Sequence, residues 1–161
     1  LTGSGKSSIA QKIVEKYGAI QLSSDVERKR MFQLAATESG KAAVNKGIYN
    51  PRTTEKVYQR LTELATTVIS AGFTPIIDAT FLKYKHRKLF QELAEQLQVP
   101  LVIINCEAIS DELRKRTMQR NTNVNDPSDS YLEVLEMQEK DLEPLREDEK
   151  KFIINHKKWL E

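Results

Sequence analysis

The first eight residues, LTGSGKSS, combine glycine, lysine and serine at the spacing of a phosphate-binding loop. They match G-x-x-x-x-G-K-[ST] from its second position onward, which makes Gly5 the second glycine of the motif. In such a loop backbone N–H groups turn toward the β- and γ-phosphates, a lysine (Lys6) neutralises their charge, and a hydroxyl (Ser7) ligates Mg²⁺. We therefore expect a nucleoside triphosphate to bind along the loop residues Thr2, Gly3, Ser4, Gly5, Lys6, Ser7 and Ser8.

A carboxylate and a guanidinium follow the apolar run AIQLS (19–23), which is typical of a buried strand. Asp25 and Arg28 are three residues apart, so a helix that starts after this run places both on one face. In phosphoryl transfer such a carboxylate accepts the proton of the attacking hydroxyl, and such an arginine holds the acceptor. A structural alternative stays open, because Ser24 and Glu27 have the spacing of a capping box.

A second carboxylate, Asp78, ends the apolar stretch TPII that starts at residue 74. A carboxylate in this position can orient the Mg²⁺ that serves the phosphate loop, or the water molecules around that ion. The alternative is an ordinary turn residue after a strand. Because Ala79 follows Asp78 where many hydrolysing ATPases carry a glutamate, the sequence favours transfer to an acceptor over hydrolysis.

Three further arginines are candidates for contacts with anionic ligands. Arg87 lies on the apolar stripe of a predicted helix, where it could contact a phosphate or the acceptor; the alternative is a packed stem with its charged head in solvent. The neighbouring His86 is expected to be a surface residue. Arg116 and Arg120 share a helical face in the stretch 111–130, which we expect to be a lid over bound ATP; the alternative is a solvated helical face.

The elements that must position these residues alternate between apolar runs and amphipathic helices. Candidate strands are 19–23, 74–80, 101–106 and 151–156. Their apolar stretches lack polar alternation, as buried parallel strands do. Helices are predicted over 6–17, from Asn50-Pro51 to Gly72, and in the segment that ends before Pro100. In open α/β sheets ligands bind beyond the carboxyl ends of the strands, which is where Asp25 and Asp78 fall.

A phosphate loop also needs a buried strand that holds its first glycine, and the chain begins with Leu1 rather than Met. We expect this strand, together with that glycine, upstream of Leu1, where a fused domain would also fit. With the four runs it makes a mostly parallel five-stranded sheet in the three-layer α/β fold of P-loop NTPases, with a helical, arginine-bearing lid. The chain, 1–161, is expected to be a single domain.

Composition narrows the classes of partner. Apolar residues make up 39% of the chain and charged residues 30%, and the net charge of +2 argues against a dedicated nucleic-acid-binding surface. The single cysteine, Cys106, sits in an apolar run and is expected in the core. Because there is no apolar stretch of about 18 residues and no visible signal peptide, we expect no membrane partner and a cytoplasmic location.

Five segments together resemble the predicted kinases of the zeta-toxin-like P-loop group, an AAA-type ATP-binding kinase group: SGKSS, SSDVER, IIDATFL with KHR, CEA, and DPSDSYLEVLEMQ. The resemblance runs from Leu1 to about Leu145, and DATFL and DPSDS are its most specific parts. Some members of that group are fused behind an aminoglycoside-phosphotransferase-like domain. The chain is similar, more distantly, to the kinase domain of polynucleotide kinases.

The resemblance implies a small ATP- and Mg²⁺-dependent kinase. It implies Lys6 and Ser7 on phosphate and Mg²⁺, and Asp25 as the base that deprotonates the acceptor. It also implies Arg28 near the acceptor, and Arg116 and Arg120 as lid contacts to ATP.

We therefore expect transfer of the γ-phosphoryl group to a hydroxyl of a small molecule or sugar nucleotide or, less favoured, of a nucleic-acid end. The catalytic groups expected are Lys6, Asp25, Arg28 and Arg116. One alternative is an NTP-hydrolysing switch, which is disfavoured because Asn45-Lys46 does not continue as the guanine-binding N-K-x-D signature. The other is a non-catalytic ATP-sensing domain of a larger protein, which needs no base beside the acceptor.

Overall fold

The computed structural model of the chain describes residues 1, 4–33, 50–106 and 128–154, with the backbone alone for 128–134. The chain forms two compact units, one of residues Ala10–Ala79 and one of Leu1–Ile9 with Thr80–Glu161. The helix α1 (Lys6–Tyr17) has the bounds that the sequence predicts, and the chain passes within it from one unit to the other. The single domain over 1–161 stays a prediction.

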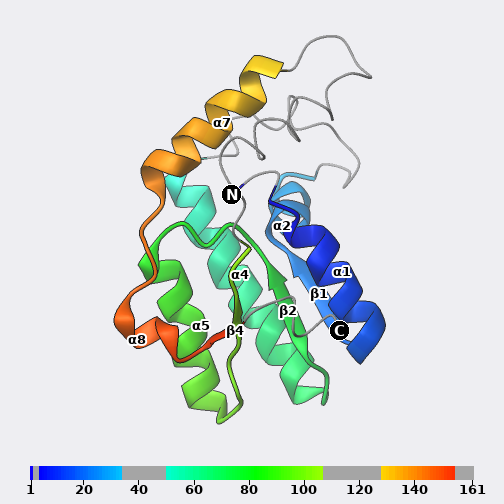
Figure 1. Cartoon of the computed structure of the whole chain (residues 1–161). Helices are drawn as coiled ribbons and strands as arrows, with labels where there is room; N and C mark the ends of the chain where they lie inside the picture. Colours follow the sequence, from blue (N-terminus) through cyan, green and yellow to red (C-terminus); the bar gives the residue numbers. More distant parts are fainter. Residues whose placement is uncertain (2–3, 34–49, 107–127, 155–161) are drawn as a thin grey trace. The chain divides into compact units, whose positions relative to one another are not determined.

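The unit Ala10–Ala79 is built around two parallel strands. Besides the end of α1 its elements are β1 (Ile20–Ser23), α2 (Ser24–Met31), α4 (Pro51–Ser70) and β2 (Pro75–Asp78). The register of the strands ends with Ser23 opposite Asp78, so both strands end at the same edge. Figure 1 shows β1 and β2 side by side, and α4 contacts both strands as well as α2.

The apolar stripe of α4 supplies the core of this unit. Val57 and Leu61 are fully buried and Ala65 is 1% exposed, and their spacing of four residues places them on one face of the helix. The helix begins at Pro51, a residue that suits the first helical position because it has no N–H to leave unpaired. The side chain of Asn50 caps the helix by accepting a hydrogen bond from the N–H of Thr53 at 2.8 Å.

Replacing Asn50 by alanine is expected to lower the free energy of unfolding by about 1 kcal/mol, because the N–H of Thr53 loses its acceptor. Urea-induced unfolding followed by circular dichroism measures this change. The matched control is Asn50→Asp, which keeps a side-chain acceptor and should cost far less. Equal losses in the two variants would contradict a role of this side chain as a cap.

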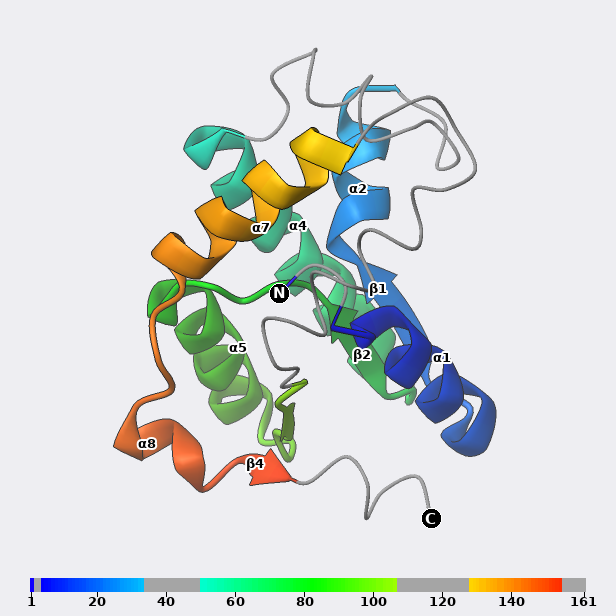
Figure 2. The ribbon, with the colours of Figure 1, turned by 45° about the horizontal axis from the view of Figure 1, so that its top comes forward.

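The second unit contains the other pair of parallel strands. Its elements, besides the start of α1, are α5 (Tyr84–Leu97), β3 (Ile103–Ile104), α7 (Ser128–Asp141), α8 (Glu147–Lys150) and β4 (Ile153–Ile154). The two strands pair in parallel, with Ile103 opposite Ile153. The rings of Phe81 and Phe90 meet edge to face, with centroids 5.4 Å apart. Figure 2 shows α7 leading through a short link into α8, which lies beside α5.

Three predictions about local structure differ from what the described residues show. β1 pairs with β2 and β3 pairs with β4, and each strand is shorter than its apolar run. The fifth strand, expected upstream of Leu1, stays a prediction. The capping box is wrong by one residue: β1 runs through Ser23 in extended conformation and α2 starts at Ser24, so the Ser23 hydroxyl accepts from the N–H of Val26.

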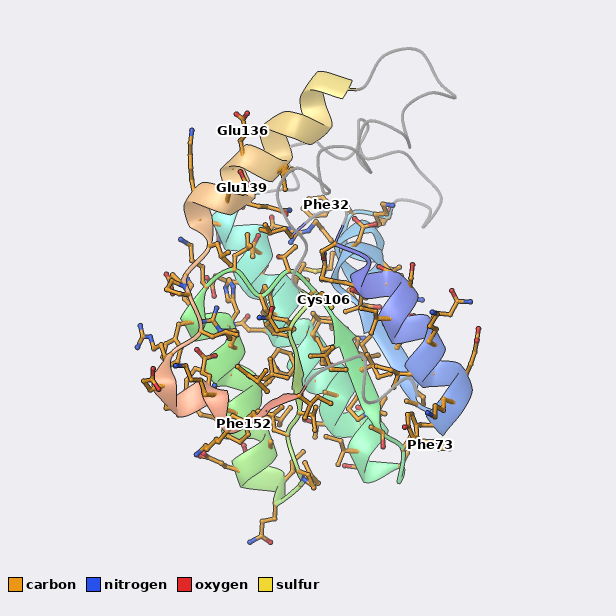
Figure 3. The ribbon with its side chains drawn as sticks, in the orientation of Figure 1. Phe32, Phe73, Cys106, Glu136, Glu139 and Phe152 are labelled. Atoms are coloured by element: carbon orange, nitrogen blue, oxygen red, sulfur yellow. The ribbon has the colours of Figure 1, made fainter. Side chains whose placement is uncertain are left out.

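The third difference concerns Cys106, which is half-buried rather than in the core. Cys106, labelled in Figure 3, lies two residues after the end of β3. Its Sγ lies 3.8 Å from the carbonyl oxygen of Ile104.

None of the helices in the described part of the chain combines the length and apolar character that crossing a membrane requires.

Candidate active site

The phosphate-binding loop turns directly into α1. Gly5 has a φ of +84°, a conformation that side chains with a Cβ rarely adopt, and no other atom lies close to the place where a Cβ would stand. The glycine is therefore required for its backbone conformation and not for space. Ser4 is 7% exposed, and its N–H donates to the carbonyl oxygen of Leu1 at 3.3 Å. The ammonium of Lys6 lies over the same loop, donating to the Leu1 carbonyl and, at 3.4 Å, to the Ser4 hydroxyl.

The first turn of α1 offers further groups for an anion. Ser7 and Ser8 are exposed there, and N–H groups in the first turn of a helix have no carbonyl within the helix to bond. These donors and the positive end of the helix dipole attract phosphate. The positive φ of Gly5 and the exposed serines at the start of α1 are compatible with a phosphate site. Phosphate binding by these residues stays a prediction, and Thr2 and Gly3 lie outside the described residues.

The carboxyl edge of the β1–β2 pair gathers the two predicted carboxylates. Asp78 is the last residue of β2 and is 9% exposed, and it accepts a hydrogen bond of 2.9 Å from the amide nitrogen of Gln21. Asp25 lies in the first turn of α2, two residues beyond the end of β1. The parallel register therefore brings both residues to one edge, as expected from the order of runs in the sequence.

The helix α2 buries three consecutive charged side chains, those of Glu27, Arg28 and Lys29. Arg28 donates from Nη1 to the hydroxyl of Thr54 at 3.3 Å, and Glu27 lies 4.0 Å from the guanidinium of Arg60. Both partners belong to α4, so these contacts tie α2 to that helix. The sequence gives no hydrophobic signal for this packing, because α2 is almost entirely polar.

Asp25 forms an ion pair with Lys29 of the same helix, which was not expected from the sequence. Its Oδ2 lies 2.9 Å from Nζ of Lys29, one helical turn further on. The Asp25 side chain is 51% exposed, whereas that of Lys29 is 9% exposed. The i,i+4 spacing of the two residues is a signal that could have found the pair.

Arg87 is held in a network of the second unit. Its Nε and Nη2 donate to the two oxygens of Glu149 at 2.6 and 2.9 Å, so the pair is bidentate. Nη1 donates to the carbonyls of Phe81 and Glu143 at 3.0 and 3.1 Å, and Nη2 also donates to that of Pro144 at 3.1 Å. Each guanidinium nitrogen thus has a partner, which favours a structural role; contact with the acceptor stays a prediction.

Arg87 and His86 are both more buried than the sequence analysis expects. Arg87 is 6% exposed, so the alternative of a charged head in solvent is wrong. The ion pair with Glu149 offsets the loss of hydration that burial of the guanidinium causes. His86 is 5% exposed and is not a surface residue. The partner of Arg87, Glu149, lies 62 residues further along the chain, and nothing within α5 indicates that contact.

The Glu149 carboxylate is fully buried. Burial raises its pKa, but the hydrogen bonds from the Arg87 guanidinium and from the N–H of Arg146 outweigh burial and hold the pKa of Glu149 below its usual 4.5. Close by, the hydroxyl of Tyr84 donates to Asp148 at 3.0 Å, and this hydrogen bond is the main cause that raises the pKa of Tyr84. The guanidinium of Arg146 stacks on the Tyr84 ring at 3.6 Å.

Arg116 and Arg120 lie outside the described residues. So does the predicted lid 111–130, except for its last three residues, 128–130.

Within the described residues no group of three or more His, Cys, Asp or Glu side chains is arranged to hold a metal. Mg²⁺ bound to a triphosphate takes one or two protein oxygens and leaves the rest to phosphates and water, so the oxygen donors of Ser7 and Asp78 fit that ion chemically.

A model of the AAA domain family matches residues 1–145. The chain belongs to this family. Uncharacterized proteins of Mycobacterium bovis and Mycobacterium tuberculosis are 26% identical to the chain over 118 residues, which is 73% of the chain. The chain spans only 24% of the length of these relatives.

Three solved kinase structures resemble the chain in fold. A sugar kinase from Janibacter covers 99% of this chain and 85% of its own, with a TM-score of 0.68 and 20% identity. A gluconokinase from Sinorhizobium meliloti covers 96% and 77%, with a TM-score of 0.61 and 19% identity. The APS kinase of Mycobacterium tuberculosis in complex with AMPPNP and APS covers 86% and 70%, with a TM-score of 0.60 and 19% identity.

These likenesses establish the fold class. The chain has a P-loop NTPase-like α/β fold with parallel strands and helices, as the sequence predicts. The finer resemblance to the zeta-toxin-like group stays a prediction.

Proposed function

We propose that the chain is an ATP- and Mg²⁺-dependent kinase that transfers the γ-phosphoryl group to a hydroxyl of a small molecule. The observation that carries the proposal is the position of Asp25, a half-exposed carboxylate at the carboxyl edge of the β1–β2 pair in a chain that starts with a phosphate-binding loop. An acceptor-side base is what phosphoryl transfer to a hydroxyl needs and what mere binding of a nucleotide does not.

In the proposed step the acceptor hydroxyl gives its proton to the Asp25 carboxylate while its oxygen bonds to the γ-phosphorus. The bond from that phosphorus to the bridging oxygen breaks, and ADP leaves with the electron pair. Lys6 and the N–H groups at the start of α1 neutralise the phosphate oxygens. Contact of Arg28 with the acceptor stays a prediction, because its side chain is buried and its Nη1 donates to Thr54 of α4. Ser7 and Asp78 are the residues that would hold Mg²⁺, which when bound would neutralise further charge on the phosphates. Arg116 and Arg120 close over ATP as lid residues, and Arg116 stabilises the transferring group.

The acceptor class is supported by the fold neighbours and by charge. The neighbours are a gluconokinase, a sugar kinase and an APS kinase that was solved with AMPPNP and APS. Each name denotes transfer to a small molecule. The low net charge of +2 gives no support to a nucleic-acid end as the acceptor.

The test is transfer of labelled γ-phosphate from ATP to a panel of sugars, sugar acids, sugar nucleotides, nucleosides and oligonucleotide 5′ ends. A labelled small molecule is the expected product. The control is Lys6→Gln, which should weaken ATP binding about 10- to 100-fold because a charge-assisted hydrogen bond is lost. Labelling that Lys6→Gln leaves unchanged would come from a contaminant, and ATP bound without any labelled acceptor or turnover would contradict the proposal.

A second candidate is a nucleotide-sensing domain within a longer protein. The chain covers 24% of the length of its curated relatives, and a nucleotide-binding domain of a longer protein can act by binding ATP alone. A sensor binds ATP with no need for Asp25, so tight ATP binding without Asp25-dependent turnover would favour it.

A further inference from the structure

The pair of Asp25 and Lys29 combines an accessible carboxylate with a buried ammonium. Lysine is almost never buried without a partner, and the Lys29 side chain is 9% exposed. Its flexible stem is therefore confined, and the carboxylate 2.9 Å from it is confined with it. An exposed pair at the same helical spacing leaves both side chains free to change rotamer and contributes little.

The rotation of α2 about its axis is fixed by other residues. Glu27 and Arg28 are directed at α4, through Arg60 and Thr54. At 3.6 residues per turn, Asp25 lies roughly 60° from Arg28 and roughly 160° from Glu27 around the helix axis. The direction of the ion pair is therefore set by the packing of α2 against α4.

We propose that Lys29 is a positioning residue for Asp25, an inference that rests on the proposed kinase function. The Lys29 ammonium holds the Asp25 carboxylate in the direction from which it takes the proton of the acceptor hydroxyl. Lys29 itself touches neither ATP nor acceptor. Holding the base in place matters because a displacement of about 1 Å in a reacting group can cost about 100-fold in rate.

The experiment compares Lys29→Met and Lys29→Arg, each in the natural chain and in the Asp25→Asn background. It uses the acceptor that the panel identifies, and it measures kcat and the KM values for ATP and acceptor. We expect Lys29→Met to lower kcat about 10- to 100-fold with the KM for ATP unchanged, and Lys29→Arg to recover most of the loss. In the Asp25→Asn background Lys29→Met should cost nothing further, because it acts only through Asp25.

Lys150→Met is the matched control, since it removes a lysine from an exposed pair with Glu147 and should leave kcat unchanged. If Lys29→Met fails to fold in a thermal melt, Lys29→Gln replaces it. If the natural chain is active and the Lys29 substitutions leave its kcat unchanged, the role of Lys29 is overturned and the proposed kinase function is not. So would a further loss in the Asp25→Asn background, which would place Lys29 on the ligand itself. A natural chain that transfers no phosphate overturns the proposed function, and the inference with it.

Discussion

Replacing Asp25 by asparagine is expected to lower kcat for phosphoryl transfer about 10²- to 10⁴-fold and to leave ATP binding intact. Asparagine has the shape of aspartate but cannot accept the proton that the acceptor hydroxyl loses. Because the side chain is 51% exposed and lies in the first turn of α2, the substitution leaves no cavity. Single-turnover transfer from labelled ATP measures the chemical step, and a fluorescent ATP analogue measures binding.

The chain offers a close control for this substitution. Asp141 is 52% exposed and its Oδ1 lies 3.1 Å from Nζ of Lys83, so it is also a half-exposed aspartate paired with a lysine. Asp141→Asn should leave kcat near that of the natural chain. A kcat for Asp25→Asn within a few-fold of that control would show that Asp25 is not the base. An equal loss in ATP affinity and in kcat would place Asp25 on the nucleotide side of the reaction instead.

Local and periodic features of the fold could be predicted from the sequence. The bounds of α1, the cap and stripe of α4 and the parallel pairing of the strands all follow from spacing and from residues such as Gly5, Asn50 and Pro51. Asp25 and Asp78 could be placed at one sheet edge because each follows an apolar run, and parallel strands end together.

Contacts between distant segments could not be predicted. The partner of Arg87 is Glu149, 62 residues away, and the partner of Asp78 is Gln21, 57 residues away. Neither distance has a periodic signature, and a charged residue on an apolar stripe looks the same whether it will bind a ligand or a buried carboxylate. The polar helix α2 is the other failure, because its packing against α4 depends on hydrogen bonds and ion pairs that hydropathy does not encode.

The network around Arg87 suggests why a costly buried charge is present in the second unit. A single guanidinium binds the carbonyls of Phe81, Glu143 and Pro144, and so joins the segment after β2 to the link between α7 and α8. The N–H of Glu143 also donates to the carbonyl of Leu82 at 2.8 Å. Only a donor with several N–H groups in a fixed plane can satisfy these acceptors together with a carboxylate. We therefore expect lysine to be a poor replacement for Arg87.

Replacing Glu149 by glutamine is expected to lower the free energy of unfolding by about 3–5 kcal/mol, because it leaves the Arg87 charge buried without its counter-charge. For a chain of this length the melting temperature should fall by about 6–20 °C. Glu147→Gln is the matched control: it lies on the same helix, is 87% exposed in its side chain, and should change stability by less than about 0.5 kcal/mol. Thermal and urea-induced unfolding of both variants measure the difference.

The pH dependence of the same pair provides a second, independent measurement. The folded state holds the pKa of Glu149 below its usual 4.5, so the carboxylate stabilises the fold fully above that value. This stabilisation is lost as the pH falls through the lowered pKa, because the folded state must then take up a proton at the expense of the Arg87 pair. Glu149→Gln has no such proton to gain, so the gap in stability between it and the natural chain should narrow as the pH is lowered from 6 toward 3. A gap that stays constant over this range would show that the variant is destabilised by packing and that the ion pair contributes nothing.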